Sequence, residues 1–127
     1  MKTIFYPTLE EALHLYRMLI DRFGGQHGVR DFGLIESALA RPQSGYYETL
    51  AAQGAALLQS FTMNHGFIDG NKRIAFALTA VFLRLNGYRI VASADEAESF
   101  LVGEVIENRV SLEQIATWLY EHWESIS

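Results

Sequence analysis

The chain has 127 residues, ten basic and 15 acidic side chains, and a formal net charge of −5, and half of its residues are apolar. A domain of this length buries roughly two thirds of its unfolded surface. It therefore needs no disulfide framework, and without cysteine it can form neither disulfides nor thiolate metal sites. The acidic balance argues against direct nucleic-acid binding, the longest near-apolar run is about half a membrane span, and the N-terminus lacks a signal peptide's apolar stretch, so we expect a cytoplasmic protein without membrane contact.

Apolar residues recur at spacings of three and four along most of the chain, which predicts helices. Capping boxes mark the starts of three of them, with a threonine or serine followed three residues later by Glu or Gln. The first helix ends at a pair of glycines and the second at an Arg-Pro sequence. The expected ranges, in chain order, are 9–23, 32–40, about 49–64, about 70–86, a fifth helix after Ser93 and a sixth after Ser111.

The predicted helix over residues 70–86 is apolar on nearly every face, which is typical of a helix at the centre of a bundle. Residues 88–91 are expected to be a short extended piece. No repeat, linker or low-complexity segment divides the chain. We therefore predict one all-α domain over residues 1–127, with six helices around a buried central helix.

The segment that suggests chemistry is His65-Gly66-Phe67-Ile68-Asp69-Gly70-Asn71-Lys72-Arg73, before and within the first turn of that helix. Lys72 and Arg73 lie where the helix dipole is positive, and each costs about 0.3–1 kcal/mol there unless an anion is bound. Free backbone N–H groups of the first turn point the same way. Dipole, donors and cations together predict a phosphate site.

Each residue of this segment has a candidate role. Gly70 permits close approach of the backbone, Asn71 can donate from its amide, and Asp69 can hold Mg²⁺ between itself and phosphates. His65 can accept a hydroxyl proton. Taken singly, these residues also fit a helix cap, a solvated face or a loop histidine, but their combination favours a catalytic site.

Residues 65–73 resemble the HxFx(D/E)GN(G/K)R motif of the Fic/Doc family. Residues 30–42 and 82–88 are also similar to segments typical of its Doc branch, so that, with the short length, the resemblance covers essentially the whole chain. It implies a six-helix fold and ATP-dependent transfer to a protein hydroxyl. It further implies a toxin that phosphorylates a threonine of elongation factor Tu and is silenced by a Phd-type antitoxin.

Two departures from the longer Fic motif, GNGRxxR, distinguish the branches. Lys72 replaces the glycine before the first arginine, and Phe76 replaces the second arginine. One phosphate-binding cation is thus lost from the helix and another is gained beside Arg73. We therefore expect transfer of the γ-phosphate of ATP, with Asp69, Arg73 and His65 as catalytic residues. AMP transfer is the alternative, and an inactive Fic-like binding module is the second.

The loop over residues 43–48 corresponds, by the resemblance, to the flap that docks the target, and Tyr46 and Tyr47 are candidates for pairing with it. Some Fic proteins silence themselves with a helix that contains (S/T)xxxE(G/N). Ser44 and Glu48 have that spacing, but Thr49 follows where glycine or asparagine is needed. We therefore expect inhibition by a separate antitoxin chain.

Overall fold

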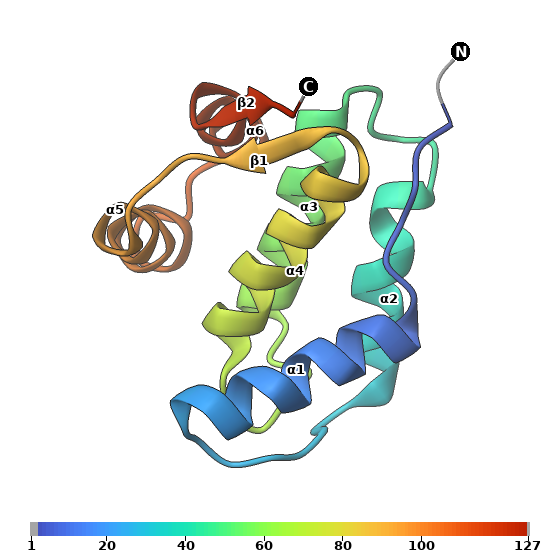
Figure 1. Ribbon diagram of the computed structural model, residues 1–127, viewed down its shortest axis with the longest axis vertical. Coiled ribbons are helices and arrows are strands. Elements are labelled where there is room, and N and C mark those ends of the chain that lie inside the picture. The colour runs from blue at the N-terminus through green and yellow to red at the C-terminus, as the bar shows by residue number, and fades with distance from the viewer. Residues whose placement is uncertain (1–2, 127) are drawn as a thin grey trace.

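The computed structural model describes residues 3–126, and the fold is mainly helical (Figure 1). Its elements, in chain order, are α1 (Leu9–Phe23), α2 (Phe32–Ala40), a 3₁₀ turn (Arg41–Gln43), α3 (Leu50–Met63), α4 (Asn71–Leu85), β1 (Tyr88–Ile90), α5 (Ala94–Ser99), π-helical turns (Phe100–Glu107), α6 (Leu112–Glu121) and β2 (Trp123–Ser125). The prediction of an all-α domain with six helices is confirmed.

Helices α3 and α4 run antiparallel through the middle of the molecule (Figure 1). The more buried of the two is α3, in which ten of 14 residues are buried, whereas α4 buries six of 15. Helix α4 is thus the predicted central helix, and α3 beside it buries even more of its residues. Small residues explain the difference: a Cβ on Gly54 would lie 3.3 Å from Leu119 Cδ1, so α6 can approach α3 closely. In α4, Phe76 and Ala77 instead border a cleft.

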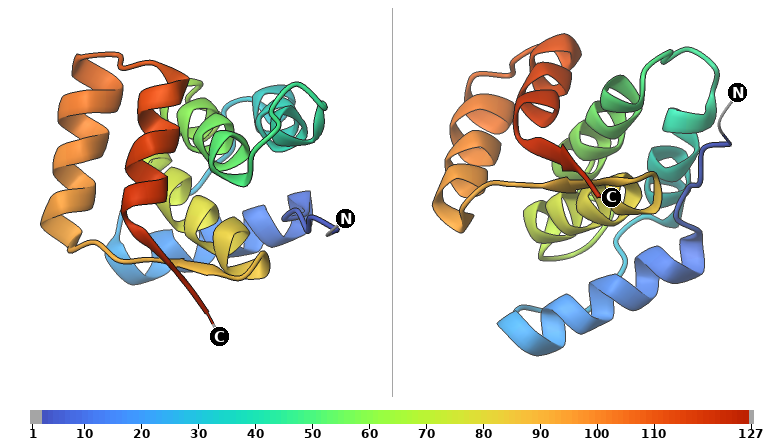
Figure 2. Two further views of the ribbon diagram at one scale, coloured as in Figure 1. Left: turned by 90° about the horizontal axis from the view of Figure 1, so that it is seen from above. Right: turned by 45° about the horizontal axis from the view of Figure 1, so that its top comes forward.

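The other helices surround this pair on two sides. Helix α1 crosses the end at which α3 finishes and α4 begins, and α2 lies beside α3 (Figure 1). Helices α5 and α6 cover the opposite side (Figure 2). No helix within residues 3–126 combines the length and the apolar character needed to cross a bilayer.

The expected capping boxes are present. The hydroxyls of Thr8, Ser93 and Ser111 each accept a hydrogen bond from the backbone N–H three residues on. The fifth predicted helix is also present, and its second half widens into π-helical turns in which Asn108 N–H donates to Gly103 O. A short antiparallel pairing of β1 with β2 was not predicted at its second strand, because residues 123–125 are too few to show an alternating pattern.

Candidate active site

The predicted catalytic residues lie at the lower end of the α3–α4 pair in Figure 1, with His65 and Asp69 in the loop that joins the two helices and Arg73 in the first turn of α4. His65 follows the C-cap residue of α3 and has a φ angle of +52°, a left-handed conformation that is unusual for a residue other than glycine. Its side chain is exposed and lines the cleft described below. A base at this position can reach a hydroxyl that arrives from solvent.

The start of α4 has the properties of an anion site. Gly70 is its N-cap with a φ angle of +76°, and no side chain caps the helix. The N–H groups of Asn71, Lys72 and Arg73 form the first turn, where a helix leaves its donors without intrahelical partners. Gly70 is required here because the left-handed conformation favours glycine, and because a Cβ would lie 2.9 Å from Ile20 Cδ1.

A cleft of about 1090 Å³ opens beside this helix start, between α4 and the α5 region. Its polar end contains the predicted site residues and Glu98, and its other walls are mostly apolar. The residues lining the cleft are Phe23, Thr62, His65, Ile68, Asp69, Gly70, Asn71, Lys72, Arg73, Phe76, Ala77, Ala92, Ser93, Ala94, Ala97, Glu98, Leu101, Val102 and Ile106. The cleft brings all six predicted site residues together, and its volume suits a small-molecule ligand.

Asp69 is held in place by two backbone donors. Its Oδ1 accepts from Gly70 N at 2.8 Å and its Oδ2 from Gln26 N at 3.0 Å. The hydrogen bond from Gln26, then that from Gly70, lowers the pKa of the Asp69 carboxyl below its ordinary value. The group is therefore ionised at neutral pH. It is also exposed, and each oxygen keeps a second lone pair.

Asn71 has a structural role that the sequence analysis did not predict. Its Oδ1 accepts from Phe67 N at 3.1 Å, and its Nδ2 donates to Phe67 O at 3.0 Å. The side chain thus pairs with the loop backbone and holds the loop against the first turn of α4. One of the two amide hydrogens remains for a ligand.

The two cations of the first turn point in different directions. Lys72 Nζ lies 3.5 Å from Glu98 Oε1 across the cleft, and both side chains are about half exposed. Arg73 instead turns towards the end of α1, where its Nη1 donates to Gly24 O at 2.8 Å. Both side chains line the cleft, Lys72 on the side of α5 and Arg73 on the side of α1.

Sequence reasoning missed the contribution of residues 24–31, which connect α1 to α2. This segment lies along the α3–α4 loop over residues 64–70, which we name the catalytic loop after its predicted base. Val29 forms a β-bridge with Phe67, and Ile68 N donates to Gly28 O at 3.0 Å. A Cβ on Gly25 would lie 2.8 Å from Asp69 Oδ2, so the segment can approach this closely only as glycine. The glycines of this segment were a signal, although they were interpreted only as the end of a helix.

The loop over residues 43–48 lies at the opposite end of α3 from His65 (Figure 1). The 14 residues of α3 separate the two loops by about 20 Å. Tyr46 is exposed there, and Tyr47 accepts a hydrogen bond from Arg41 Nε at 2.6 Å. This separation argues against a direct role of loop 43–48 in holding an acceptor hydroxyl at His65.

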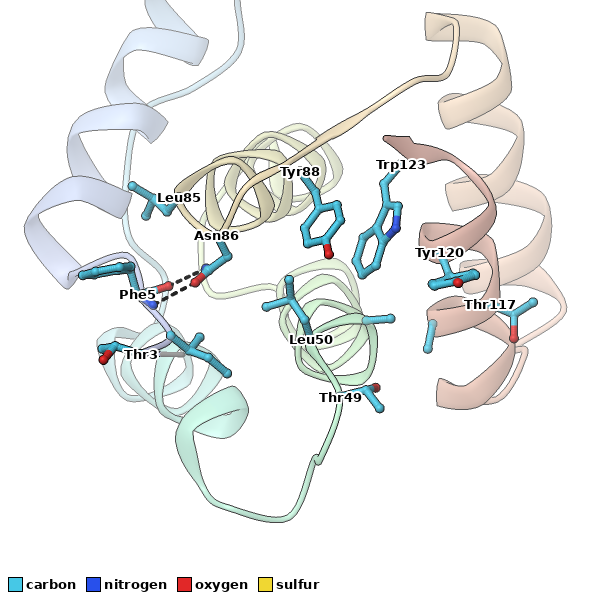
Figure 3. Close-up of a pocket in the computed structure, with 13 residues that line it drawn as sticks. Thr3, Phe5, Thr49, Leu50, Leu85, Asn86, Tyr88, Thr117, Tyr120 and Trp123 are labelled. Atoms are coloured by element: carbon cyan, nitrogen blue, oxygen red, sulfur yellow. Dashed lines mark hydrogen bonds between the residues drawn. The ribbon is translucent and has the colours of Figure 1, made fainter. Parts of the chain in front are cut away.

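A second cleft, of about 820 Å³, lies at that same far end, between the N-terminal segment, α3 and α6 (Figure 3). Its walls are mostly apolar and include Leu50, Tyr88 and Trp123. Asn86, its most polar neighbour, is paired with the backbone of Phe5. None of its lining residues is charged, so it lacks the cations that a phosphate site requires.

Comparison with known proteins gives consistent results. The sequence model of the Fic/DOC family matches residues 6–83. The toxin Doc of Mycolicibacterium smegmatis is 43% identical over 104 residues, which are 76% of this chain and 79% of that protein. The protein kinase doc of Escherichia phage P1 is 34% identical over 93 residues, which are 70% of this chain and 74% of that protein.

Proposed function

The chain belongs to the Fic/DOC family, and from this premise we propose that it transfers the γ-phosphate of ATP to a threonine or serine hydroxyl of a protein. The proposed target is elongation factor Tu, whose modification would block translation. The proposed biological role is that of the toxin of a toxin–antitoxin pair. Two relatives support this proposal, since one is named a toxin and the other a protein kinase.

The observation that carries the proposal is the polar end of the cleft, at the start of α4, where we expect the phosphates to bind. Uncapped N–H groups of α4 and the Lys72 ammonium converge there, and Phe76 follows one helical turn after Lys72. By the resemblance, family members that transfer AMP have an arginine at the position of Phe76. Without that cation, the charge at the helix start suits the terminal phosphate better than the α-phosphate.

In the proposed reaction, an acceptor hydroxyl approaches His65 from solvent and gives up its proton to the imidazole. The hydroxyl oxygen forms a bond to the γ-phosphorus, and the bond from that phosphorus to the β,γ-bridging oxygen breaks, which releases ADP. Lys72 and the first-turn N–H groups of α4 bind the phosphate oxygens. Phosphoryl transfer depends mainly on such positioning and charge stabilisation.

Asp69 fits a role in holding Mg²⁺. It is an exposed, ionised carboxylate beside the phosphate site. Residues 3–126 contain no cluster of three or more metal-binding side chains, so the phosphates would have to supply other ligands, as is usual for Mg²⁺. When bound, the ion neutralises phosphate charge.

Arg73 was predicted to bind phosphate, and its guanidinium, which lines the cleft, also donates to the end of α1. We propose that it acts chiefly by holding α1 against the start of α4 and contributes a positive field at the phosphate site. Asn71 likewise acts chiefly by holding the loop, through Phe67.

We also propose that a separate Phd-type antitoxin silences the protein. The segment with the nearest spacing to an internal inhibitory helix, Ser44 to Glu48, lies at the far end of α3 from His65. It therefore cannot cover the phosphate site in this fold.

The first test is the intact mass of elongation factor Tu after incubation with the protein, Mg²⁺ and ATP. We expect the gain of one phosphoryl group. The gain of an adenylyl group would support AMP transfer instead. No change in elongation factor Tu or in any protein of a lysate supplied with labelled ATP would support an inactive binding module.

The His65→Ala variant tests the proposed base. We expect the transfer rate to fall by about 10²–10⁴-fold, because a positioned base contributes this much. Helical circular dichroism and the melting temperature should change little, since the imidazole is exposed. A variant that transfers phosphate at the normal rate would contradict the assignment.

A further inference from the structure

Arg30 lies in the segment between α1 and α2, outside the motif, and contacts the catalytic loop at three points. Its Nε donates to His65 O at 2.6 Å, and its Nη2 donates to Asn64 O at 3.2 Å. Its backbone N–H donates to Gly66 O at 2.8 Å. Three successive carbonyls of the loop therefore accept hydrogen bonds from a single residue.

Two of these carbonyls, those of Asn64 and His65, lie at the C-terminal end of α3. The carbonyls at a helix end lack intrahelical donors and carry the negative end of the dipole, which favours a cation. The Arg30 side chain is exposed and forms no salt bridge with any acidic group within residues 3–126. Within residues 3–126, the guanidinium donates hydrogen bonds only to the carbonyls of Asn64 and His65.

The conformation of His65 explains why such a restraint matters. A φ angle of +52° is unfavourable for a residue with a Cβ, and such a conformation persists only where the surroundings enforce it. The guanidinium of Arg30 holds the carbonyl of this same residue. If that carbonyl were released, the backbone could relax to a common conformation, and the imidazole would leave its place in the cleft wall.

We propose that Arg30 is a positioning residue for the catalytic base: its guanidinium fixes the peptide of His65 and thereby the direction of the imidazole. This inference rests on the proposed function, because it takes His65 as the base. Arg30 itself does not line the cleft.

The kinetic test compares the wild-type protein with Arg30→Met, which keeps the length of the side chain but removes its donors. Using elongation factor Tu and ATP, we expect kcat to fall by about tenfold to a hundredfold, because a misplacement of about 1 Å can cost this much. The KM for ATP should stay within about twofold. Arg30→Lys, which can restore one charged donor, should lie between the two.

A second measurement separates positioning from general stability. The imidazole resonances of His65 in a heteronuclear NMR spectrum should shift in Arg30→Met, with a melting temperature that falls no further than that of a matched control. Arg41→Met is the matched control. Arg41 also contacts α3, through Ser60 Oγ at 2.9 Å and Gln59 Oε1 at 2.9 Å, but nearer the N-terminus of the helix than the Arg30 contacts. It should lower the melting temperature and leave the His65 resonances unchanged.

The proposal is overturned if the His65 resonances of Arg30→Met are those of the wild type, or if they change as much in Arg41→Met. A loss of activity through KM alone would also overturn it, because that result would make Arg30 a ligand contact. A wild-type protein without any transferase activity would refute the proposed function instead. The NMR comparison would then still decide whether Arg30 orients His65.

Discussion

At the scale of single residues, two buried threonines show how much a hydrogen bond alters the same side chain. Thr62 in α3 and Thr79 in α4 are 1% and 0% exposed. The Thr79 hydroxyl donates to Ala75 O at 2.8 Å, whereas the Thr62 hydroxyl has no partner among residues 3–126. An unpaired buried polar group costs about 1–3 kcal/mol, so Thr62 is a weak point in the core of α3.

Substitution by valine should therefore have opposite effects at these two positions. Valine has nearly the same shape and removes only the hydroxyl, so neither change leaves a cavity. We expect Thr62→Val to raise the free energy of unfolding by about 1 kcal/mol and Thr79→Val to lower it by about 1 kcal/mol. Urea denaturation with an unchanged m value would measure both. Equal losses in the two variants would show that Thr62 has a partner in solution.

At the scale of single residues, the sequence predicted which residues form the site but not the contacts that hold them. The motif identified His65, Asp69 and Asn71, and the structure places them at one cleft. The side chains of Asp69 and Asn71 bond to backbone groups, such as Gln26 N and Phe67 N, which no residue type at those positions reveals. Side-chain chemistry suggested that Asn71 binds phosphate, whereas its main contacts hold the loop.

At the scale of elements, Arg73 makes the contact between the end of α1 and the start of α4. Arg73 Nη1 donates to Gly24 O, and its guanidinium lies 5.7 Å from the centre of the Phe23 ring. A cation at the C-terminal end of α1 is favoured by that helix's dipole. The same arginine therefore satisfies α1 while it occupies an unfavourable position in the first turn of α4.

Because Arg73 also bonds to α1, substitution of the two neighbouring cations should change the free energy of unfolding by different amounts. Arg73→Met should lower the free energy of unfolding by about 1 kcal/mol, because the carbonyl of Gly24 loses a charged donor. Lys72→Met is the control and should change stability by less than about 0.5 kcal/mol, since its pairing with Glu98 is solvent-exposed. Chemical denaturation of both variants tests this, and equal losses would contradict the assignment of Arg73 to α1.

Elements were predicted well where local signals were strong. Capping boxes at Thr8, Ser93 and Ser111 marked helix starts because they are satisfied within four residues. The relative burial of α3 and α4 was not predictable in this way. It depends on which neighbours cover each helix, and the small side chains of α3, such as Gly54, are what allow α6 to pack against it.

At the scale of the whole molecule, the two ends of the α3–α4 pair differ in chemistry. One end has the ionic cleft, and the other has the apolar cleft between α3 and α6 (Figure 3). The ionic end is closed by contacts between segments far apart in the sequence. Asp69 is central to them, because it joins the catalytic loop to the α1–α2 connection through Gln26 N.

This joining contact should depend on pH. The pKa of Asp69 is lowered in the folded protein, so its stabilising effect is complete above the ordinary aspartate pKa of about 3.9 and is lost as the pH falls through the folded pKa. We expect wild type to be more stable than Asp69→Asn at neutral pH. The difference should shrink as the pH falls below about 4.

Glu11 provides the control, because hydrogen bonds with Thr8 also lower the pKa of its carboxyl. Glu11→Gln should remove a similar pH-dependent contribution, yet only at the start of α1. Amide hydrogen exchange then separates the two: the N–H groups of Gln26 and Gly70 should exchange faster in Asp69→Asn and at the wild-type rate in Glu11→Gln. Unchanged exchange at Gln26 in Asp69→Asn would mean that other contacts suffice to hold the α1–α2 connection on the catalytic loop.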